Sequence, residues 1–174
     1  MDDGPGDPSG VHPTDRLMRE LLLTRRKTTP RDVGQIVRRI ATAPFMGEVR
    51  VPPRDRGLSY LGRTVGAREN SRFYHLAKRV AEGQWAEGTT EEAYLQDPKD
   101  AVRSSDARVV LYRYRGGDLA AALAPNGMPQ WRRGNGPLAY IFVVYSVDRA
   151  RIVSGYQVSG IGEVQVSGNP LWLK

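Results

Sequence analysis

The chain has 174 residues, of which 26 are Lys or Arg and 19 are Asp or Glu, and it contains no cysteine. This length favours one domain with its own core. The absence of cysteine excludes disulfides, thiolate metal sites and a cysteine nucleophile. No apolar run reaches the ~18 residues of a membrane span, and residues 1–10 lack the apolar core of a secretory leader. We expect a basic protein that is cytoplasmic as synthesised and that, if exported, is delivered without a leader.

The first half of the chain has the apolar spacing of helices. Residues 1–13 are rich in Gly, Pro and Asp, which predicts a disordered leader before a single domain over 14–174. Thr14 or Asp15 is expected to cap the first helix, and a Thr89–Glu92 capping box the fourth. Prolines at 44, 52 and 53 predict an extended segment over 43–66. The helices are expected over residues 14–27, 30–42, 70–82 and 89–103.

The second half is rich in β-branched and aromatic residues, which are typical of strands. Gly116-Gly117-Asp118 is a hairpin signal between the first two expected strands. Strands are expected over residues 108–114, 119–124, 138–145, 152–158 and 163–166. This order predicts an α+β fold in which N-terminal helices pack on a four- to five-stranded antiparallel meander. The domain then comprises an Arg-rich helical part (14–56), further helices (57–107) and the sheet (108–174).

Positive charge is concentrated in residues 11–80 and 108–174, and an acidic segment, 81–107, separates the two. The net charge of +7 is carried mostly by arginine. Arginine matches phosphate through two parallel hydrogen bonds, so the pattern indicates a polyanionic partner such as nucleic acid. A genomic bias toward arginine codons is the alternative explanation.

His75 is the candidate catalytic residue. On a helical wheel it points away from the apolar face formed by Phe73, Leu76, Ala77 and Val80. Arg72, Lys78 and Arg79 lie three or four residues from it, on the same outer side. Their like charge disfavours the imidazolium form, lowers the expected pKa and keeps His75 able to accept a proton. The alternative is a solvated helix face that happens to include a histidine.

Several other kinds of site find little support in the sequence. Common phosphate-binding glycine motifs and metal-binding histidine motifs are absent, so we expect no cofactor and no metal. The acidic residues of the fourth helical region are expected to form a solvated face rather than a Mg²⁺ site. These residues are Glu87, Glu91, Glu92, Asp97 and Asp100.

Polar side chains also occur within the predicted strands and loops. Ser154 and Tyr156 share one face of their strand, where each could donate to a phosphate or serve only as a strand residue. Arg113 lies on an earlier expected strand, on the face opposite Tyr112 and Tyr114. The loop that contains Trp131, Arg132 and Arg133 suits stacking on an unpaired base with phosphate contacts beside it. Equally, Trp131 could anchor this loop in the core.

The layout over about residues 57–160 resembles the barnase, EndoU, colicin and RelE-like group of ribonuclease toxins. The resemblance lies in Y-H-L-A-K-R (74–79), G-Q-W (83–85), T-T-E-E-A-Y-L (89–95) and the hairpin over 140–156. It implies that His75 is the general base or acid and that Lys78 or Arg79 contacts phosphate. It implies a strand contribution from Ser154 and Tyr156. The Arg-rich residues 14–56 lie outside the minimal fold of this group.

The resulting hypothesis is a metal-independent endoribonuclease toxin that cleaves RNA by attack of the 2′-OH. Arg72, Arg113, Trp131, Arg132 and Arg133 would then bind the RNA. An acidic immunity protein is the expected partner. One alternative is a non-catalytic nucleic-acid-binding protein that reads DNA with the helices over 14–27 and 30–42. Another is an interaction module such as an immunity or adaptor protein, against which the positive net charge argues.

Overall fold

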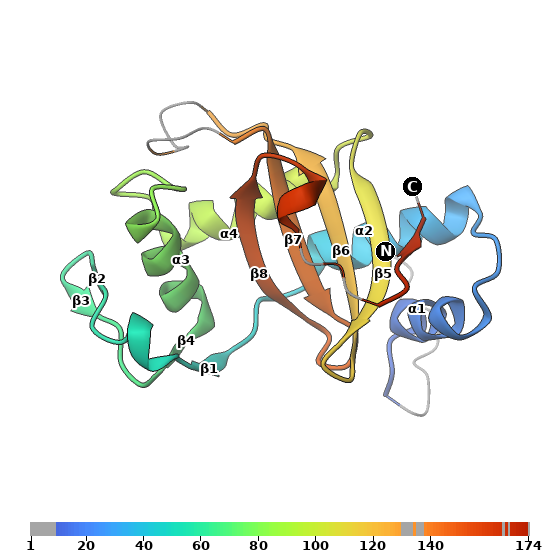
Figure 1. The fold of residues 1–174 in the computed structure, drawn as a ribbon, viewed down its shortest axis with the longest axis horizontal. Helices are drawn as coiled ribbons and strands as arrows, with labels where there is room; N and C mark the ends of the chain where they lie inside the picture. The colour runs from blue at the N-terminus through green and yellow to red at the C-terminus, as the bar shows by residue number, and fades with distance from the viewer. Residues whose placement is uncertain (1–9, 130–133, 135–137, 165, 167, 174) are drawn as a thin grey trace.

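A computed structural model describes residues 10–129, 134, 138–164, 166 and 168–173. Within these residues, four helices and a five-stranded antiparallel sheet form an α+β fold in which helices come first, which confirms the expected class. The strand order of the sheet is β8-β7-β6-β5-β9. Figure 1 shows this sheet between α1 on one side and α3 on the other.

The first two helices, α1 (Pro13–Thr24) and α2 (Pro30–Thr42), follow the predicted apolar spacing. Thr29 and Asp32 form a reciprocal capping box at the start of α2. The cap of α1 differs from the expectation. The Nδ1 atom of His12, rather than Thr14 or Asp15, accepts the first free backbone N–H, because both of those residues are buried inside the helix.

The segment between α2 and α3 folds into short elements rather than one extended stretch. It contains two small antiparallel strand pairs, β1 with β4 and β2 with β3, and a 3₁₀ turn, η1, between β1 and β2. Together with α3 they form a lobe beside the main sheet (Figure 1). The elements of this segment are β1 (Glu48–Arg50), η1 (Pro53–Asp55), β2 (Ser59–Tyr60), β3 (Arg63–Thr64) and β4 (Arg68–Asn70).

Helices α3 (Ser71–Ala81) and α4 (Glu91–Val102) end close to the predicted positions. Asn70 caps α3 by accepting from the backbone N–H of Arg72. Thr90, and not Thr89, caps α4, and it accepts from the backbone N–H of Ala93. The Thr89 hydroxyl instead donates to the carbonyl of Ala86, which removes the predicted capping box.

Four long strands form the meander as predicted. Neighbouring strands pair antiparallel throughout, and a register shift between Val144 and Tyr145 marks a bulge against β8. In a regular strand, Ile152 and Ser154 would face the same side of the sheet. Because the bulge adds a residue between them, they face opposite sides. The strands are β5 (Arg108–Tyr114), β6 (Gly117–Pro125), β7 (Tyr140–Ser146) and β8 (Arg151–Val158).

The last strand is not where the sequence predicts it. Residues 161–163 form a 3₁₀ turn, η3 (Ile161–Glu163), and residues 164 and 166 are outside any strand. The fifth strand is β9 (Leu171–Trp172), which pairs with β5 at the far side of the sheet. Tertiary pairing across the sheet therefore overrides the local β-propensity of residues 163–166.

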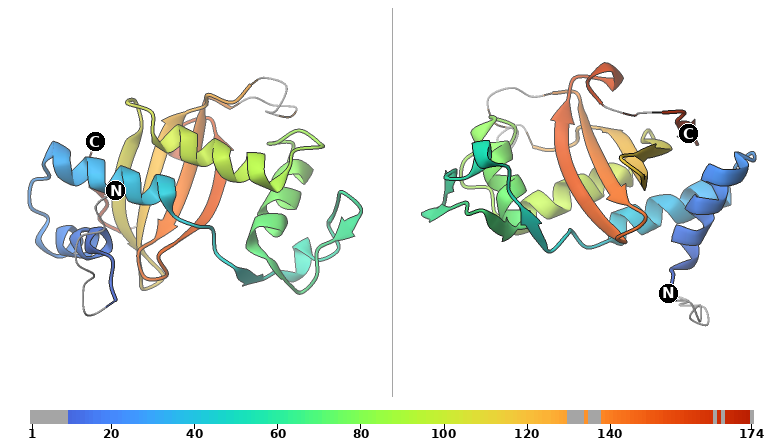
Figure 2. Two further views of the ribbon diagram at one scale, coloured as in Figure 1. Left: turned by 180° about the vertical axis from the view of Figure 1, so that it is seen from behind. Right: turned by 60° about the horizontal axis from the view of Figure 1, so that its bottom comes forward.

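The two faces of the sheet are covered differently. Helices α2 and α4 cross one face, which we call the helix-covered face (Figure 2). Its core includes Val109, Leu111, Ala122 and Val143, and small alanines on β6 allow α4 to pack closely. The opposite face carries a smaller cluster around Tyr112 and Phe142, and parts of the C-terminal segment pack on it.

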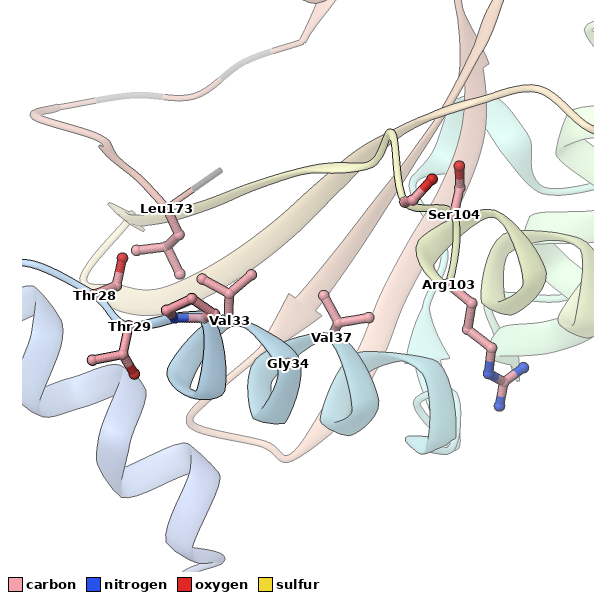
Figure 3. A pocket seen from close by; sticks show the side chains of 10 residues that line it. Thr28, Thr29, Val33, Gly34, Val37, Arg103, Ser104 and Leu173 are labelled. Atoms are coloured by element: carbon pink, nitrogen blue, oxygen red, sulfur yellow. The ribbon is translucent and has the colours of Figure 1, made fainter.

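A hollow of about 480 Å³ lies on the helix side of the molecule, between α2 and the turn after α4. Figure 3 shows hydroxyl groups and apolar side chains mixed along its wall. Its wall residues include Val33, Val37, Ser104 and Leu173. In the described part of the chain, none of the helices combines the length and the apolar composition needed to cross a lipid bilayer.

Candidate functional site

Helix α3 is buried on more than one side. Phe73, Leu76 and Ala77 face the core as predicted. Arg79, however, is only 9% exposed, although the helical wheel places it on the outer side. The reason is that α3 also contacts β8, so a second side of the helix is covered by the edge of the sheet.

Arg79 joins α3 to β8. Its Nη2 donates to Ser154 Oγ at 3.1 Å, and its guanidinium lies 4.9 Å from the centre of the Tyr156 ring. Its Nη1 donates to Glu82 Oε2 at 2.9 Å. The structure therefore brings together three of the predicted site residues, Arg79, Ser154 and Tyr156, from elements 75 positions apart in the chain.

The position of β8 relative to the helices depends on a close contact with α4. The buried Tyr94 hydroxyl donates to the Gly155 carbonyl at 3.0 Å. A Cβ atom at Gly155 would lie 2.9 Å from Pro98 Cγ, so only glycine allows this approach. Gln84 accepts from the Gln157 backbone N–H at 2.8 Å. These contacts hold the backbone on both sides of Ser154 and Tyr156.

His75 is partly buried, and its Nδ1 atom is fully enclosed without a hydrogen-bond partner. Burial, together with the nearby charges of Arg79 and Lys78, lowers the pKa of His75 to about 3, and Asp55 opposes this shift. The sequence predicts the direction and the effect of the cations, but it does not predict burial as the main cause. The imidazole is neutral at physiological pH and has the form that accepts a proton.

Two groups beside His75, Tyr74 and Asp55, could not be predicted from the sequence as parts of this site. Tyr74, whose ring centre is 5.0 Å from that of His75, donates its hydroxyl to Asp55 Oδ2. Lys78 Nζ lies 3.7 Å from the same carboxylate oxygen. Burial and the Asp55 carboxylate raise the pKa of Tyr74 above its ordinary value. Asp55 lies in η1, 19 positions before Tyr74, so no spacing rule could connect it with this helix.

The remaining candidates are less closely connected. Arg72 is exposed at the start of α3, where its Nε and backbone N–H both face Asn70 Oδ1. Arg113 is 62% exposed and pairs with Asp118 on β5 and β6, away from β8 in the strand order. The three loop candidates, Trp131, Arg132 and Arg133, lie outside the described residues.

The acidic residues of the fourth helical region do not form one solvated face. Asp97 is 9% exposed and accepts from Trp85 Nε1 at 3.1 Å, so it is part of the core. Asp100 accepts from Gln96 at the surface. Among the residues that the structure describes, no group of three or more His, Asp or Glu side chains is arranged to hold a metal ion.

Comparisons with protein-family models, curated proteins and solved structures found no match to this chain.

Proposed function

We propose that the protein is an endoribonuclease that cleaves RNA without a metal ion. The observation that carries the proposal is the contact of Arg79 with Ser154 and Tyr156, on the helix that also bears His75 and Lys78. Helix α3 thus carries a neutral imidazole and two cations, and one of these cations, Arg79, contacts two hydroxyl-bearing residues of β8. Proton acceptors, cations and hydroxyls are the groups that RNA transesterification requires.

In the proposed reaction, the 2′ oxygen of a ribose attacks the adjacent phosphorus and the bond to the 5′ oxygen breaks. His75 accepts the proton of the 2′-OH, and the leaving 5′ oxygen takes up a proton from solvent. Lys78 and Arg79 stabilise the extra negative charge on the phosphorus oxygens. The product is a 2′,3′-cyclic phosphate. Proton transfer of this kind contributes roughly 10²–10⁴-fold to the rate.

The test is incubation of the purified chain with total RNA. We expect cleavage that persists in EDTA, and we expect His75→Ala to abolish it while circular dichroism shows an intact fold. Undiminished cleavage by a folded His75→Ala protein would overturn the role of His75. Loss of cleavage in EDTA would overturn the metal-independent mechanism.

The proposal includes an acidic inhibitor protein, because a cell that produces a ribonuclease toxin needs protection. Such a partner would cover the surface around His75 and neutralise the nearby cations. Expression of the chain alone in a sensitive host should arrest growth, and co-expression with the inhibitor should restore it. Normal growth during expression of the chain alone would contradict the toxin role.

A second candidate function is nucleic-acid binding without cleavage. Exposed cations at the start of α2, Lys27 and Arg31, favour it. However, α2 packs with its apolar side against the sheet core and does not project as a separate module. A salt-dependent shift of duplex DNA, with no cleavage of RNA, would support this alternative.

A further inference from the structure

Three buried side-chain polar atoms have no hydrogen-bond partner in the described structure, and all three belong to α3. They are Ser71 Oγ, His75 Nδ1 and Arg79 Nε. Residues four positions apart lie on the same side of a helix, so these atoms form a row along α3. Buried polar atoms in native proteins are paired in more than about nine cases of ten. Two of these atoms, His75 Nδ1 and Arg79 Nε, are one helical turn apart, and together they indicate a partner from outside the chain.

The chemistry of His75 and Arg79 defines this partner. The Nε atom of Arg79 can only donate a hydrogen bond, and the two terminal nitrogens already donate to Glu82 and Ser154. A protonated His75 Nδ1 also donates. Two donors one helical turn apart, beside the positive charge of Lys78, are matched by the oxygens of a small anion. Ser71 is about 12 Å from Arg79 along the helix axis and is fully buried, so it lies outside the reach of the same anion.

We propose that α3 binds a phosphate-sized oxyanion between His75 Nδ1 and Arg79 Nε, and that this binding is coupled to proton uptake by His75. The inference rests on the proposed function, because it concerns the same residues. It deepens that function by assigning the activating group. The phosphate oxygens of the RNA itself convert His75 from an inert imidazole into an effective proton acceptor.

The coupling follows from the charges that face His75. Arg79 and Lys78 on α3 disfavour its protonation, Asp55 from η1 favours it, and Tyr74 adds only a neutral ring. A bound anion offsets the two cations. An opposite charge within about 4–6 Å raises the pKa of a base by roughly 1–3 units. By reciprocity, each unit corresponds to about tenfold tighter anion binding to the protonated protein.

The experiment is an NMR titration of the full chain with sulfate as the probe. The titration extends down to about pH 3, because His75 has a pKa of about 3 without the anion, and sulfate remains a dianion over this range. The chain has only two histidines, and His12, which caps α1, is the internal control. We expect sulfate to raise the pKa of His75 by about one unit or more and to leave the His12 resonance unchanged. An unchanged His75 resonance in saturating sulfate would overturn the proposal.

Variants then separate a specific site from general attraction. Arg79→Lys keeps the charge but lacks the Nε donor, and we expect sulfate binding to weaken at least about tenfold. Arg38→Gln removes a charge from an exposed position on α2 and should leave His75 unaffected. Sulfate binding by Arg79→Lys that equals the wild type would reject Nε as a ligand.

A further variant keeps the test valid if Arg79→Lys does not fold. His75→Gln should bind sulfate with an affinity that no longer rises as the pH falls, measured by calorimetry. An unchanged pH dependence would reject the coupling. If sulfate binding is coupled to proton uptake by His75 but RNA is not cleaved, the oxyanion site stands and the proposed nuclease activity is rejected. If RNA is cleaved but no coupling is found, only the oxyanion site is rejected.

Discussion

Gly155 decides how closely α4 approaches β8. Its hypothetical Cβ atom would lie 2.9 Å from Cγ and 3.3 Å from Cβ of Pro98, and the proline ring cannot rotate away. The residues on either side of Gly155 are the two that contact Arg79. A change at Gly155 therefore affects both the stability of the sheet edge and the geometry of the candidate site.

We expect Gly155→Ala to lower the free energy of unfolding by about 1–3 kcal/mol, because overpacking forces backbone shifts. The matched control is Gly34→Ala in α2, where no atom lies within 4 Å of the added Cβ. There alanine should raise the free energy of unfolding by about 0.5–1 kcal/mol. Urea unfolding measures both. Equal effects of the two substitutions would show that Pro98 does not constrain Gly155.

Individual site residues could be predicted from the sequence only where the cause is local. The cations near His75 are three and four positions away, so helix geometry shows their effect on its pKa. The burial of Arg79 depends on β8, and the contact of Tyr74 with Asp55 depends on η1. Such contacts between distant elements leave no periodic signal along the chain.

Elements were predictable where periodicity persists over many residues. The apolar spacing of α2 and the β-branched run of β7 mark their elements without any tertiary information. The short strand β9 contains two residues and exists only because β5 offers an unpaired edge. Its position could therefore not be read from local propensity.

A buried polar group of α1 connects the first two helices to the sheet. Asp15 of α1 accepts from Tyr145 Oη of β7 at 2.7 Å and from Arg39 Nη2 of α2 at 2.9 Å. The Asp15 residue is 3% exposed, so its carboxylate has little access to water that could replace a lost donor. This carboxylate thus connects α1, α2 and β7, and so links the Arg-rich first part of the chain to the sheet.

Removal of the Tyr145 hydroxyl leaves this buried acceptor with fewer donors. We expect Tyr145→Phe to lower the free energy of unfolding by about 1–3 kcal/mol, as measured by thermal or urea unfolding. Tyr112→Phe, on the opposite face of the same sheet, is the control and should cost less than about 1 kcal/mol. A Tyr145→Phe protein as stable as the Tyr112→Phe protein would show that Arg39 alone satisfies Asp15.

At the scale of the whole molecule, the candidate site lies where two parts of the fold meet. The lobe that contains β1 to β4 and α3 packs against the edge strand of the five-stranded sheet (Figure 1). The imidazole of His75 is buried in this lobe, one helical turn from Arg79, which contacts β8. Its protonation is therefore linked to the stability of the whole fold.

Folding lowers the pKa of His75 from 6.5 to about 3. Between these values the unfolded chain binds a proton that the folded chain does not. The contribution of His75 to stability is complete above pH 6.5 and is lost as the pH falls toward 3. The maximum slope is about 1.4 kcal/mol per pH unit.

We expect the free energy of unfolding to fall as the pH is lowered from 6.5 to about 4.5, and to fall more steeply for the wild type than for His75→Gln. Most carboxylates titrate below roughly this range. Urea unfolding in chloride buffers, without phosphate or sulfate, measures both curves. Arg38→Gln, at an exposed position on α2, is the control, and its curve should run parallel to that of the wild type. If the His75→Gln curve also ran parallel to the wild type, His75 would take up its proton equally in the folded and unfolded chain. The burial of its imidazole would then have no electrostatic consequence.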